Sequence, residues 1–494
     1  MNEKSILDLF FTPKTVAIIG ASNEVNSPGY VTFKNFVDNK KKGKFKGEVF
    51  PVNIKGEIIL GYKAYKSILD IPSKVDLAVV IVPAKYVPQV MKEIGEKGTK
   101  AVAIISAGFS EIGNVELERQ VVEIAKSYGI RILGPNGLGT LDPYSGVDTM
   151  FLPELKKTLD GKELIGTPRP EPGFMSFLSQ SGAFGVAALD YMAGEKIGLR
   201  RFVSYGNKVD VDEAELLEYL LHDNLTRAIL IYSESIKNGR KFMESAKKVT
   251  PYKPVIILKS GRTKAGQRAA SSHTAALAGS DAIYEAAFKQ SGIIRVENMQ
   301  HLFDVAKAMV FQRPARGRNI AILTDGGGAG VMASDAAEKS GLNVIPLPKR
   351  TYEKFEKLKE EGVFPKFATN VNPVDLTGSV TSEMYEIAAD ILLAEPEIHG
   401  MILIALHHPP IVDATVVDRL YRIYKKYDKP VTMCDIGSQE YAKYFREEFD
   451  KRGIPAYRTP EQAVSAMEAL IRYGEYLKKI GKLDDYLKKW KPPV

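Results

Sequence analysis

The sequence predicts an α/β protein with three doubly wound, parallel-sheet domains. Short runs rich in Val, Ile and Leu alternate with helix-length amphipathic stretches, which is the pattern of βαβ units. Glycine, proline, serine or asparagine follows most of these runs, as at Gly20-Ala21-Ser22. The length of 494 residues suits this number of domains, since one domain takes about 100–200 residues.

Composition narrows the class of protein further. The chain is 45% hydrophobic and 26% charged, as in soluble globular proteins, and apolar runs such as Leu77–Pro83 have only the length of a strand. Met1–Lys4 does not look like an export signal, so we expect a cytoplasmic protein with no membrane contact. The single cysteine, Cys434, excludes internal disulfides and cysteine-rich metal sites, and we expect no metal on this chain. The net charge of +8 is spread along the chain, which argues against nucleic-acid binding.

Five strands are predicted in the first region, and small or polar residues follow them. Because ligands bind at the carboxyl ends of strands in open parallel sheets, these loops suggest an anionic ligand. The first loop, Gly20-Ala21-Ser22, lacks the second glycine of the usual dinucleotide fingerprint. The predicted strands are Thr15–Gly20, Glu48–Val52, Asp76–Val82, Ala101–Ser106 and Arg131–Gly134.

Two further regions repeat the alternation. A stretch rich in Pro, Gly and charge, Pro153–Gly173, suggests a linker, and Gln312–Arg318 suggests another boundary. The domains expected are therefore 1–147, 174–314 and 319–494, with 148–173 as linker. The strands expected in them are Phe174–Leu178, Phe202–Tyr205, Ala228–Ser233, Val255–Lys259, Ile293–Val296, Asn319–Thr324, Met401–Leu406 and Val431–Asp435, and the last helix is Pro460–Leu477.

Two loops carry small residues between a strand and a helix. They are Ser179–Ala183 and Thr324–Gly330, which precede predicted helices at Ala183–Met192 and Val331–Lys339. Free backbone N–H groups at a helix start bind anions, and the helix dipole adds to the attraction. Glycine is equally suited to close packing of a strand and a helix, so neither loop is decisive alone. Together they favour one shared anion.

One histidine lies in a loop that contains almost no large apolar residue. The loop begins at Ser260, after the strand Val255–Lys259, and contains His273. A histidine without an evident serine or cysteine dyad suits transient phosphorylation, and Glu234, directly after Ala228–Ser233, is a candidate to hold its second nitrogen. The alternatives are a surface histidine without a role and a solvated loop glutamate.

At this point the motifs resemble those of the nucleoside-diphosphate-forming acyl-CoA synthetases, relatives of succinyl-CoA synthetase that include the ADP-forming acetate–CoA ligases. The resemblance covers nearly the whole chain in the expected order. It rests on Ser179–Ala183, Gly206–Val211, Tyr232–Ile236, Ser271–Ala275, Gly326–Gly330 and Asn372–Thr377.

The resemblance implies a Rossmann-like CoA-binding domain followed by two flavodoxin-like domains. His273 would be the phosphorylated histidine and Glu234 its stabilising partner, while helix starts at Ser181-Gly182 and Gly327-Gly328 would hold phosphate. Coenzyme A, a substrate, would contact Gly20, Ala21, Ser22, Asn53, Lys55, Pro83, Ser106, Ala107, Gly108, Pro135 and Asn136.

The resemblance also implies a partner. No region is left for an ATP-grasp domain, so we expect an α subunit that works with a separate ATP-grasp β subunit, in an α2β2 complex. ATP or ADP and Mg²⁺ would bind to that partner, and a small carboxylic acid, CoA and phosphate would be the other ligands. Leu155–Gly173 is longer than is usual in the family, and its role stays open.

Two other functions compete with the ligase. A regulatory protein that binds CoA or acyl-CoA would lack ligase activity. A nicotinamide-dependent dehydrogenase is suggested only by the first βαβ unit. Against it, the second predicted strand is followed by Asn53-Ile54-Lys55, with no acid to bind a ribose.

Overall fold

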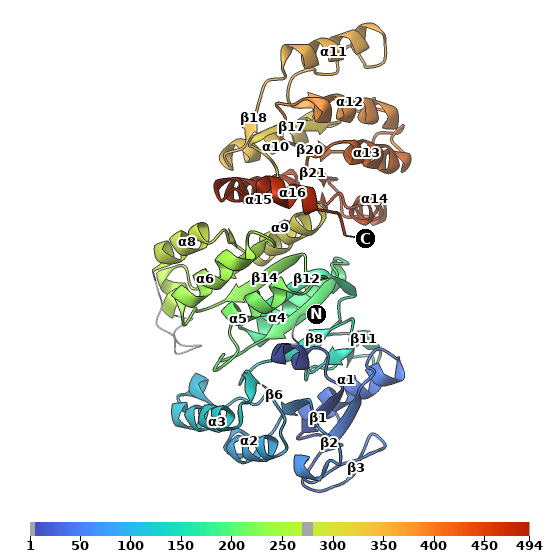
Figure 1. The fold of residues 1–494 in the computed structure, drawn as a ribbon. Coiled ribbons are helices and arrows are strands. Elements are labelled where there is room, and N and C mark those ends of the chain that lie inside the picture. Colours follow the sequence, from blue (N-terminus) through green and yellow to red (C-terminus); the bar gives the residue numbers. More distant parts are fainter. Residues whose placement is uncertain (1–4, 269–279, 494) are drawn as a thin grey trace. The chain divides into compact units, whose positions relative to one another are not determined.

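The computed structural model describes residues 5–268 and 280–493, which belong to two compact units, 1–296 and 297–494. Three sheets built mainly from parallel strands, with helices packed on them, make up the fold (Figure 1). The predicted α/β class is therefore confirmed. Each unit is described separately below.

The first sheet has the strand order β2-β1-β5-β6-β7, and all five strands are parallel. Alternate residues of β1 face two different cores: Val16 and Ile18 pack with α1, whereas Ala17 and Ile19 pack with α2 and α3. Helices α2 and α3 lie side by side (Figure 1). The elements are β1 (Thr15–Ile19), α1 (Pro28–Lys41), β2 (Glu48–Val52), β5 (Leu77–Val80), α2 (Val87–Glu96), β6 (Ala101–Ile104), α3 (Val115–Tyr128) and β7 (Arg131–Leu133), with a small hairpin of β3 (Ile58–Ile59) and β4 (Tyr62–Lys63).

The second sheet has the order β16-β15-β14-β12-β13-β8-β9. Its five parallel strands correspond to the five predicted for the second domain, whereas β8 pairs antiparallel with β13 and comes from residues expected in the first domain. The elements are β8 (Gly139–Asp142), β9 (Val147–Asp148), β12 (Pro172–Ser179), α4 (Gly182–Gly194), β13 (Leu199–Ser204), α5 (Glu213–Leu221), β14 (Ala228–Ser233), α6 (Gly239–Val249), β15 (Val255–Lys259), α8 (Asp281–Gln290) and β16 (Ile294–Val296).

The segment 148–173, expected as a linker, contains a short antiparallel hairpin. Strand β10 (Leu155–Lys157) pairs with β11 (Glu163–Ile165), and every residue of both strands is exposed. A two-stranded hairpin alone is only marginally stable in water. Most of the segment between β9 and β12, both strands of the second sheet, therefore lies on the surface.

The second unit contains one sheet of order β18-β17-β20-β21-β22, with β19 pairing to β17, all parallel. Helix α9, counted with the second domain by the sequence analysis, packs against α15 of this unit. The elements are α9 (Met299–Phe311), β17 (Asn319–Thr324), α10 (Gly327–Lys339), β18 (Asn343–Val344), α11 (Lys349–Glu360), β19 (Val374–Asp375), α12 (Ser382–Ala394), β20 (Gly400–Ile404), α13 (Thr415–Lys426), β21 (Val431–Cys434), α14 (Glu440–Lys451), β22 (Ala456–Tyr457), α15 (Pro460–Lys479) and α16 (Leu483–Lys489).

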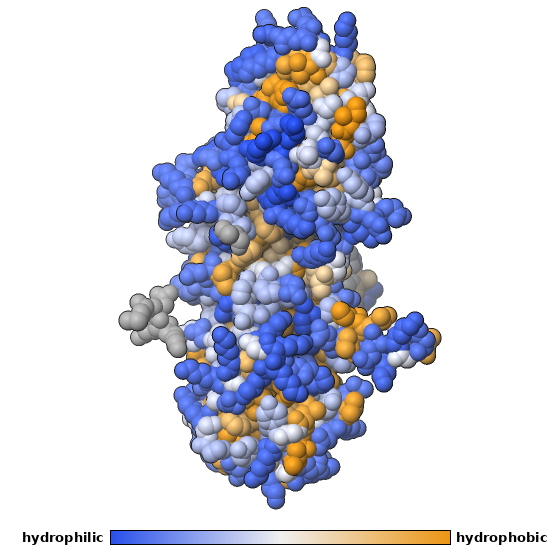
Figure 2. Space-filling model, turned by 90° about the vertical axis from the view of Figure 1, so that its right-hand side faces the viewer, coloured by the Kyte–Doolittle hydropathy of each residue, from blue (hydrophilic) through white to orange (hydrophobic). Residues whose placement is uncertain are grey.

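On the face shown in Figure 2, hydrophobic residues form scattered patches among hydrophilic ones. Within residues 5–268 and 280–493, no helix has the length and apolar character required to cross a membrane.

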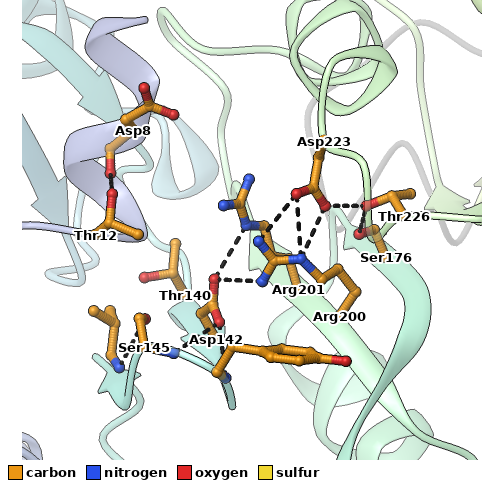
Figure 3. Close-up of polar contacts among 12 residues, drawn as sticks. Asp8, Thr12, Thr140, Asp142, Ser145, Ser176, Arg200, Arg201, Asp223 and Thr226 are labelled. Carbon is orange, nitrogen blue, oxygen red and sulfur yellow. Dashed lines mark hydrogen bonds and ion pairs between the residues drawn. The ribbon is translucent and has the colours of Figure 1, made fainter. Parts of the chain in front are cut away.

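A buried network of ion pairs connects β8 to β13, its neighbour in the second sheet. Arg200 and Arg201 of β13 both reach the carboxylate of Asp142, at 2.8 and 3.1 Å, and Arg200 also contacts Asp223 at 2.9 Å (Figure 3). The Asp142 side chain is only 1% exposed. Asp142 and Asp223 together therefore balance the charges of the two arginines at a position that is largely closed to water.

We expect Asp142→Ala to lower the apparent free energy of unfolding by about 3–5 kcal/mol, because it leaves buried guanidinium charge without its partner. Denaturant unfolding of the full chain measures the change. Asp160→Ala serves as the control, since Asp160 lies on the exposed hairpin segment beside Lys162, and we expect it to change nothing measurable. Equal stabilities of the two variants would contradict this account of the network.

Candidate functional site

The loops that follow the first sheet meet at one edge, because all five strands run in the same direction. Hydrogen bonds connect the loops: Asn53 Nδ2 donates to Ala21 O (2.7 Å), and Ser106 Oγ donates to Val82 O (2.6 Å). Asn136 N donates to Ser106 O (3.0 Å). The eleven residues predicted to contact CoA all lie on these five loops, on both sides of the switch point between β1 and β5.

Glycine is required where β1 turns into α1. Gly20 has a φ of +100°, and a Cβ atom there would stand 2.1 Å from the carbonyl oxygen of Ile81. A Cβ on Gly29 would stand 1.9 Å from the carbonyl oxygen of Gly20. The start of α1 therefore lies directly against the turn, with Ser27 as its N-cap. The close packing alone explains these two glycines.

At the carboxyl edge of the second sheet, Gln180 connects the loops of two predicted site residues, Ser181 and Glu234. Gln180 Oε1 accepts hydrogen bonds from the backbone N–H groups of Glu234 (2.9 Å) and Ser235 (3.1 Å), and Gln180 Nε2 donates to Ser235 Oγ (3.2 Å). Gln180 immediately precedes Ser181, whose hydroxyl caps α4 at Phe184 N (3.3 Å). The predicted residues Ser181, Gly182 and Glu234 therefore lie on adjacent loops at the switch point between β12 and β14.

A buried lysine fixes the backbone of Glu234 from the other side. Lys259 Nζ donates to the carbonyl oxygens of Glu234 (2.8 Å) and Ser260 (2.5 Å). Burial, with the nearby charge of Arg295, lowers the pKa of Lys259 to about 8. Neither Lys259 nor Gln180 is among the predicted site residues, although Gln180 lies within the Ser179–Ala183 motif.

The two edges of the first unit are joined by residues 205–210, which we call the linking loop. Asn207 N donates to Pro135 O (2.9 Å), and Asn207 Nδ2 donates to Glu111 (2.7 Å) and Glu118 (2.9 Å). Lys208 Nζ donates to Glu213 (3.0 Å) and to the carbonyl of Ser235. One short loop therefore contacts the predicted CoA edge and the Glu234 loop together.

The predicted phosphohistidine, His273, lies outside the described residues, which resume at residue 280. Its position relative to Glu234 and the start of α4 therefore stays a prediction. The strand before it, β15, ends at Lys259, so the chain enters this segment at the same edge as Glu234.

The second unit holds the other predicted phosphate loop at the start of α10. Gly326 is the N-cap and offers no side chain, while Gly327 and Gly328 are exposed. Two carboxylates lie nearby. Asp375 Oδ2 is 2.9 Å from the position a Cβ would take on Gly327, and Asp325 is 5% exposed.

Asp325 is an unusual acid. Its Oδ1 accepts the N–H of Leu406 (3.2 Å), and its Oδ2 is buried without a hydrogen-bond partner among the residues that the structure describes. Burial, with the charge of Asp375, raises the pKa of Asp325 to about 7. Such a group titrates near neutral pH at the start of α10.

Asn372 of the third-domain motif has a structural role. Its side chain accepts the N–H of Ile322 (2.9 Å) and donates to the carbonyls of Ile320 (2.8 Å) and Ile345 (2.9 Å). These bonds attach the segment before β19 to β17.

The fold and loops define a multidomain α/β protein with glycine-rich turns at its switch points. Family models match in chain order: a CoA binding domain at residues 14–143, a succinyl-CoA ligase like flavodoxin domain at 172–309 and a Ligase-CoA domain at 320–481. The chain therefore belongs to the nucleoside-diphosphate-forming acyl-CoA synthetases, a family of acid–CoA ligases, as its motifs predicted.

Similar proteins match along almost the whole chain. The chain is 42% identical to acetate–CoA ligase [ADP-forming] I subunit alpha of Pyrococcus furiosus, covering 95% of this chain and 98% of the relative. It is 38% identical to acetate–CoA ligase [ADP-forming] I of Archaeoglobus fulgidus, covering 95% of this chain and 64% of that longer relative. The solved dinucleotide forming acetyl-coenzyme A synthetase 1 of Ca. Korarchaeum cryptofilum, in complex with phosphate and ADP, is 35% identical with a TM-score of 0.85, covering 98% of this chain and 99% of that one.

The raised pKa of Asp325 can be tested through the pH dependence of the free energy of unfolding. Because its folded pKa of about 7 exceeds its usual value of 3.8, the folded state holds the proton more tightly. The resulting stabilisation is full at low pH and is lost as pH rises through about 7. We therefore expect the unfolding free energy of the unsubstituted chain to fall, relative to Asp325→Asn, by about 2–3 kcal/mol between about pH 5 and 8.

Denaturant unfolding at the two pH values measures this difference. Asp335→Asn is the matched control, because Asp335 is an exposed aspartate of α10, the helix that begins just after Asp325. A pH-independent difference between Asp325→Asn and the unsubstituted chain would show that Asp325 keeps its ordinary titration.

Proposed function

We propose that the chain is the α subunit of an ADP-forming acid–CoA ligase, which interconverts acyl-CoA, ADP and phosphate with a carboxylic acid, CoA and ATP. The observation that carries this proposal is the pair of hydrogen bonds that Gln180 Oε1 accepts from the backbone N–H groups of Glu234 and Ser235. These bonds hold Glu234 next to the start of α4. A carboxylate and a helix start at one switch point suit a phosphoryl group that is carried on a histidine.

The reaction runs in three reversible steps. A phosphate oxygen attacks the thioester carbonyl, forming acyl phosphate as the sulfur leaves and takes up a proton. An imidazole nitrogen of His273 then attacks phosphorus, and the carboxylate leaves. Finally an oxygen of ADP attacks phosphorus, forming ATP and freeing the imidazole.

The residues of this chain act by positioning and charge. Glu234 holds the second imidazole nitrogen of His273 and supports the cation that forms when the ring is phosphorylated. Ser181 and Gly182, with Gly327 and Gly328, supply helix starts for the phosphate oxygens. The buried Lys259 fixes Glu234 through its carbonyl, at 2.8 Å.

CoA is the proposed ligand of the first edge. Gly20, Ala21, Ser22, Asn53, Lys55, Pro83, Ser106, Ala107, Gly108, Pro135 and Asn136 would contact it. The diphosphate suits the turn at Gly20–Ser22 before the start of α1, and Lys55 would add a positive charge. A family model for CoA binding matches residues 14–143, which supports this assignment.

The nucleotide is assigned to a partner. We infer a separate ATP-grasp β subunit that binds ADP or ATP with Mg²⁺, in an α2β2 complex located in the cytoplasm. The name "subunit alpha" of the Pyrococcus furiosus relative supports a partner subunit. Acetate is the substrate named for several relatives, and we propose a small carboxylic acid here.

His273→Asn should abolish acid-labile labelling by radioactive phosphate in the presence of acyl-CoA, because no imidazole remains to accept the group. His222→Asn, at the C-cap of α5, should label like the unsubstituted chain. Glu234→Gln should label more weakly, since it cannot support the imidazolium. Labelling retained in His273→Asn would exclude this relay, the three-step transfer of the phosphoryl group through His273. An unsubstituted chain that binds CoA but is never labelled would instead be a regulatory protein.

Titration should show binding of CoA and none of NAD. Lys55→Ala should weaken CoA binding by about tenfold or more, because it removes a charged contact to a phosphate. Lys42→Ala is the control, since Lys42 is exposed after the end of α1, away from the carboxyl edge. Calorimetric titration measures both, and preferential binding of NAD would overturn the CoA assignment.

A further inference from the structure

A second histidine–carboxylate pair lies at the carboxyl edge of the sheet in the second unit. His407 follows β20 and Asp435 follows β21, which are neighbouring parallel strands. His407 Nδ1 is 2.8 and 3.0 Å from the two carboxylate oxygens of Asp435, and the backbone N–H of His407 donates to the same carboxylate (3.3 Å). The pair is therefore built by the backbone as well as by the side chains.

Asp435 is fixed in place. It is fully buried, and Arg446 of α14 donates to its carbonyl oxygen and to that of Gly437, both at 2.8 Å. The Arg446 guanidinium also lies 3.9 Å from the Asp435 carboxylate. A carboxylate held in this way keeps the proton of a neutral imidazole on Nδ1.

The other ring nitrogen is available. Within residues 5–268 and 280–493, no residue hydrogen-bonds to His407 Nε2, and the side chain is 15% exposed. The ring lies against that of His408, with centroids 3.9 Å apart and ring planes tilted by 33°, and its centroid lies 5.6 Å from that of Tyr441. The His407 ring is therefore held in one orientation and is partly exposed, and its Nε2 atom is free to bind a ligand. A histidine in a core would have both ring nitrogens hydrogen-bonded.

The pair adjoins the start of α10. Leu406, the residue before His407, donates its N–H to Asp325 Oδ1 (3.2 Å). Its side chain lies 3.0 Å from the position that a Cβ would take on Gly326, the N-cap of α10. The charged or titratable groups around the imidazole are therefore Asp435, Arg446, His408, Tyr441 and, beyond Leu406, Asp325.

We propose that His407 binds a phosphate-class oxyanion through Nε2, beside the start of α10. The choice of ligand rests on the proposed function, whereas the site rests on the His407–Asp435 geometry. A neutral ring accepts a hydrogen bond from a P–OH group, and a protonated ring donates one to a P–O⁻ group. The anion replaces water at Nε2, and Asp435 keeps the ring oriented in both states.

Selective ¹⁵N labelling of the six histidines in the full chain tests the site directly. We expect the free His407 ring to carry its proton on Nδ1, and inorganic phosphate to shift its Nε2 resonance saturably. The His408 resonance should move much less, because His408 has no carboxylate partner in the part of the chain that the structure describes.

A substitution supplies the second arm. His407→Asn keeps a donor toward Asp435 and removes Nε2, so phosphate binding at this site in equilibrium dialysis should weaken by about tenfold or more. His408→Asn, the matched neighbour, should bind as the unsubstituted chain does. An unshifted His407 resonance, or unchanged binding in His407→Asn, would overturn the proposal and leave a purely structural histidine.

The test is separable from that of the relay. Repeating the titration in the His273→Asn chain keeps the His407 site and removes the phosphoryl acceptor. If His273 is not labelled but phosphate shifts the His407 resonance, only the relay is rejected. If His273 is labelled but phosphate leaves the His407 resonance unshifted, only this inference is rejected.

Discussion

The linking loop is the constraint on which the first unit depends. Its Asn207 N–H binds the carbonyl of Pro135 on the first sheet's edge, while Lys208 pairs with Glu213 and holds the Ser235 carbonyl at the second. Lys208 is 3% exposed, so its charge is tolerated only while both partners remain in place. Two sheet edges that are predicted to bind ligands are thereby held in one fixed relation, as the transfer of a group between bound substrates would require.

Much of the fold could be predicted from local patterns. Buried parallel strands are continuously apolar, and so β14, β15 and β17 match their predicted ranges residue for residue. Pairings between distant segments leave no such local signal. Strand β8 joins the second sheet through Asp142 and two arginines more than fifty residues later, a charge network that only the folded chain brings together.

The candidate site likewise contains residues that sequence motifs predict and residues that only the folded chain brings together. Ser181, Gly182 and Glu234 belong to motifs and lie on adjacent loops, as parallel strand order requires. The groups that position them, Gln180 and Lys259, act through backbone atoms of other segments, which no motif reveals. His407 and Asp435 are polar residues after two separate strands, and only the pairing of β20 with β21 makes them a dyad. His273, the residue with the plainest sequence signal, stays a prediction.

The two helix starts that were predicted to bind phosphate are electrostatically different. Helix α4 is capped by Ser181, whereas α10 has no side-chain cap and faces the carboxylates of Asp325 and Asp375. A phosphate at α10 would be repelled by two ionised acids at close range. Since burial places the pKa of Asp325 near 7, one of these charges is removed by a proton at modest cost. A phosphate bound at the start of α10 would therefore favour the protonated form of Asp325.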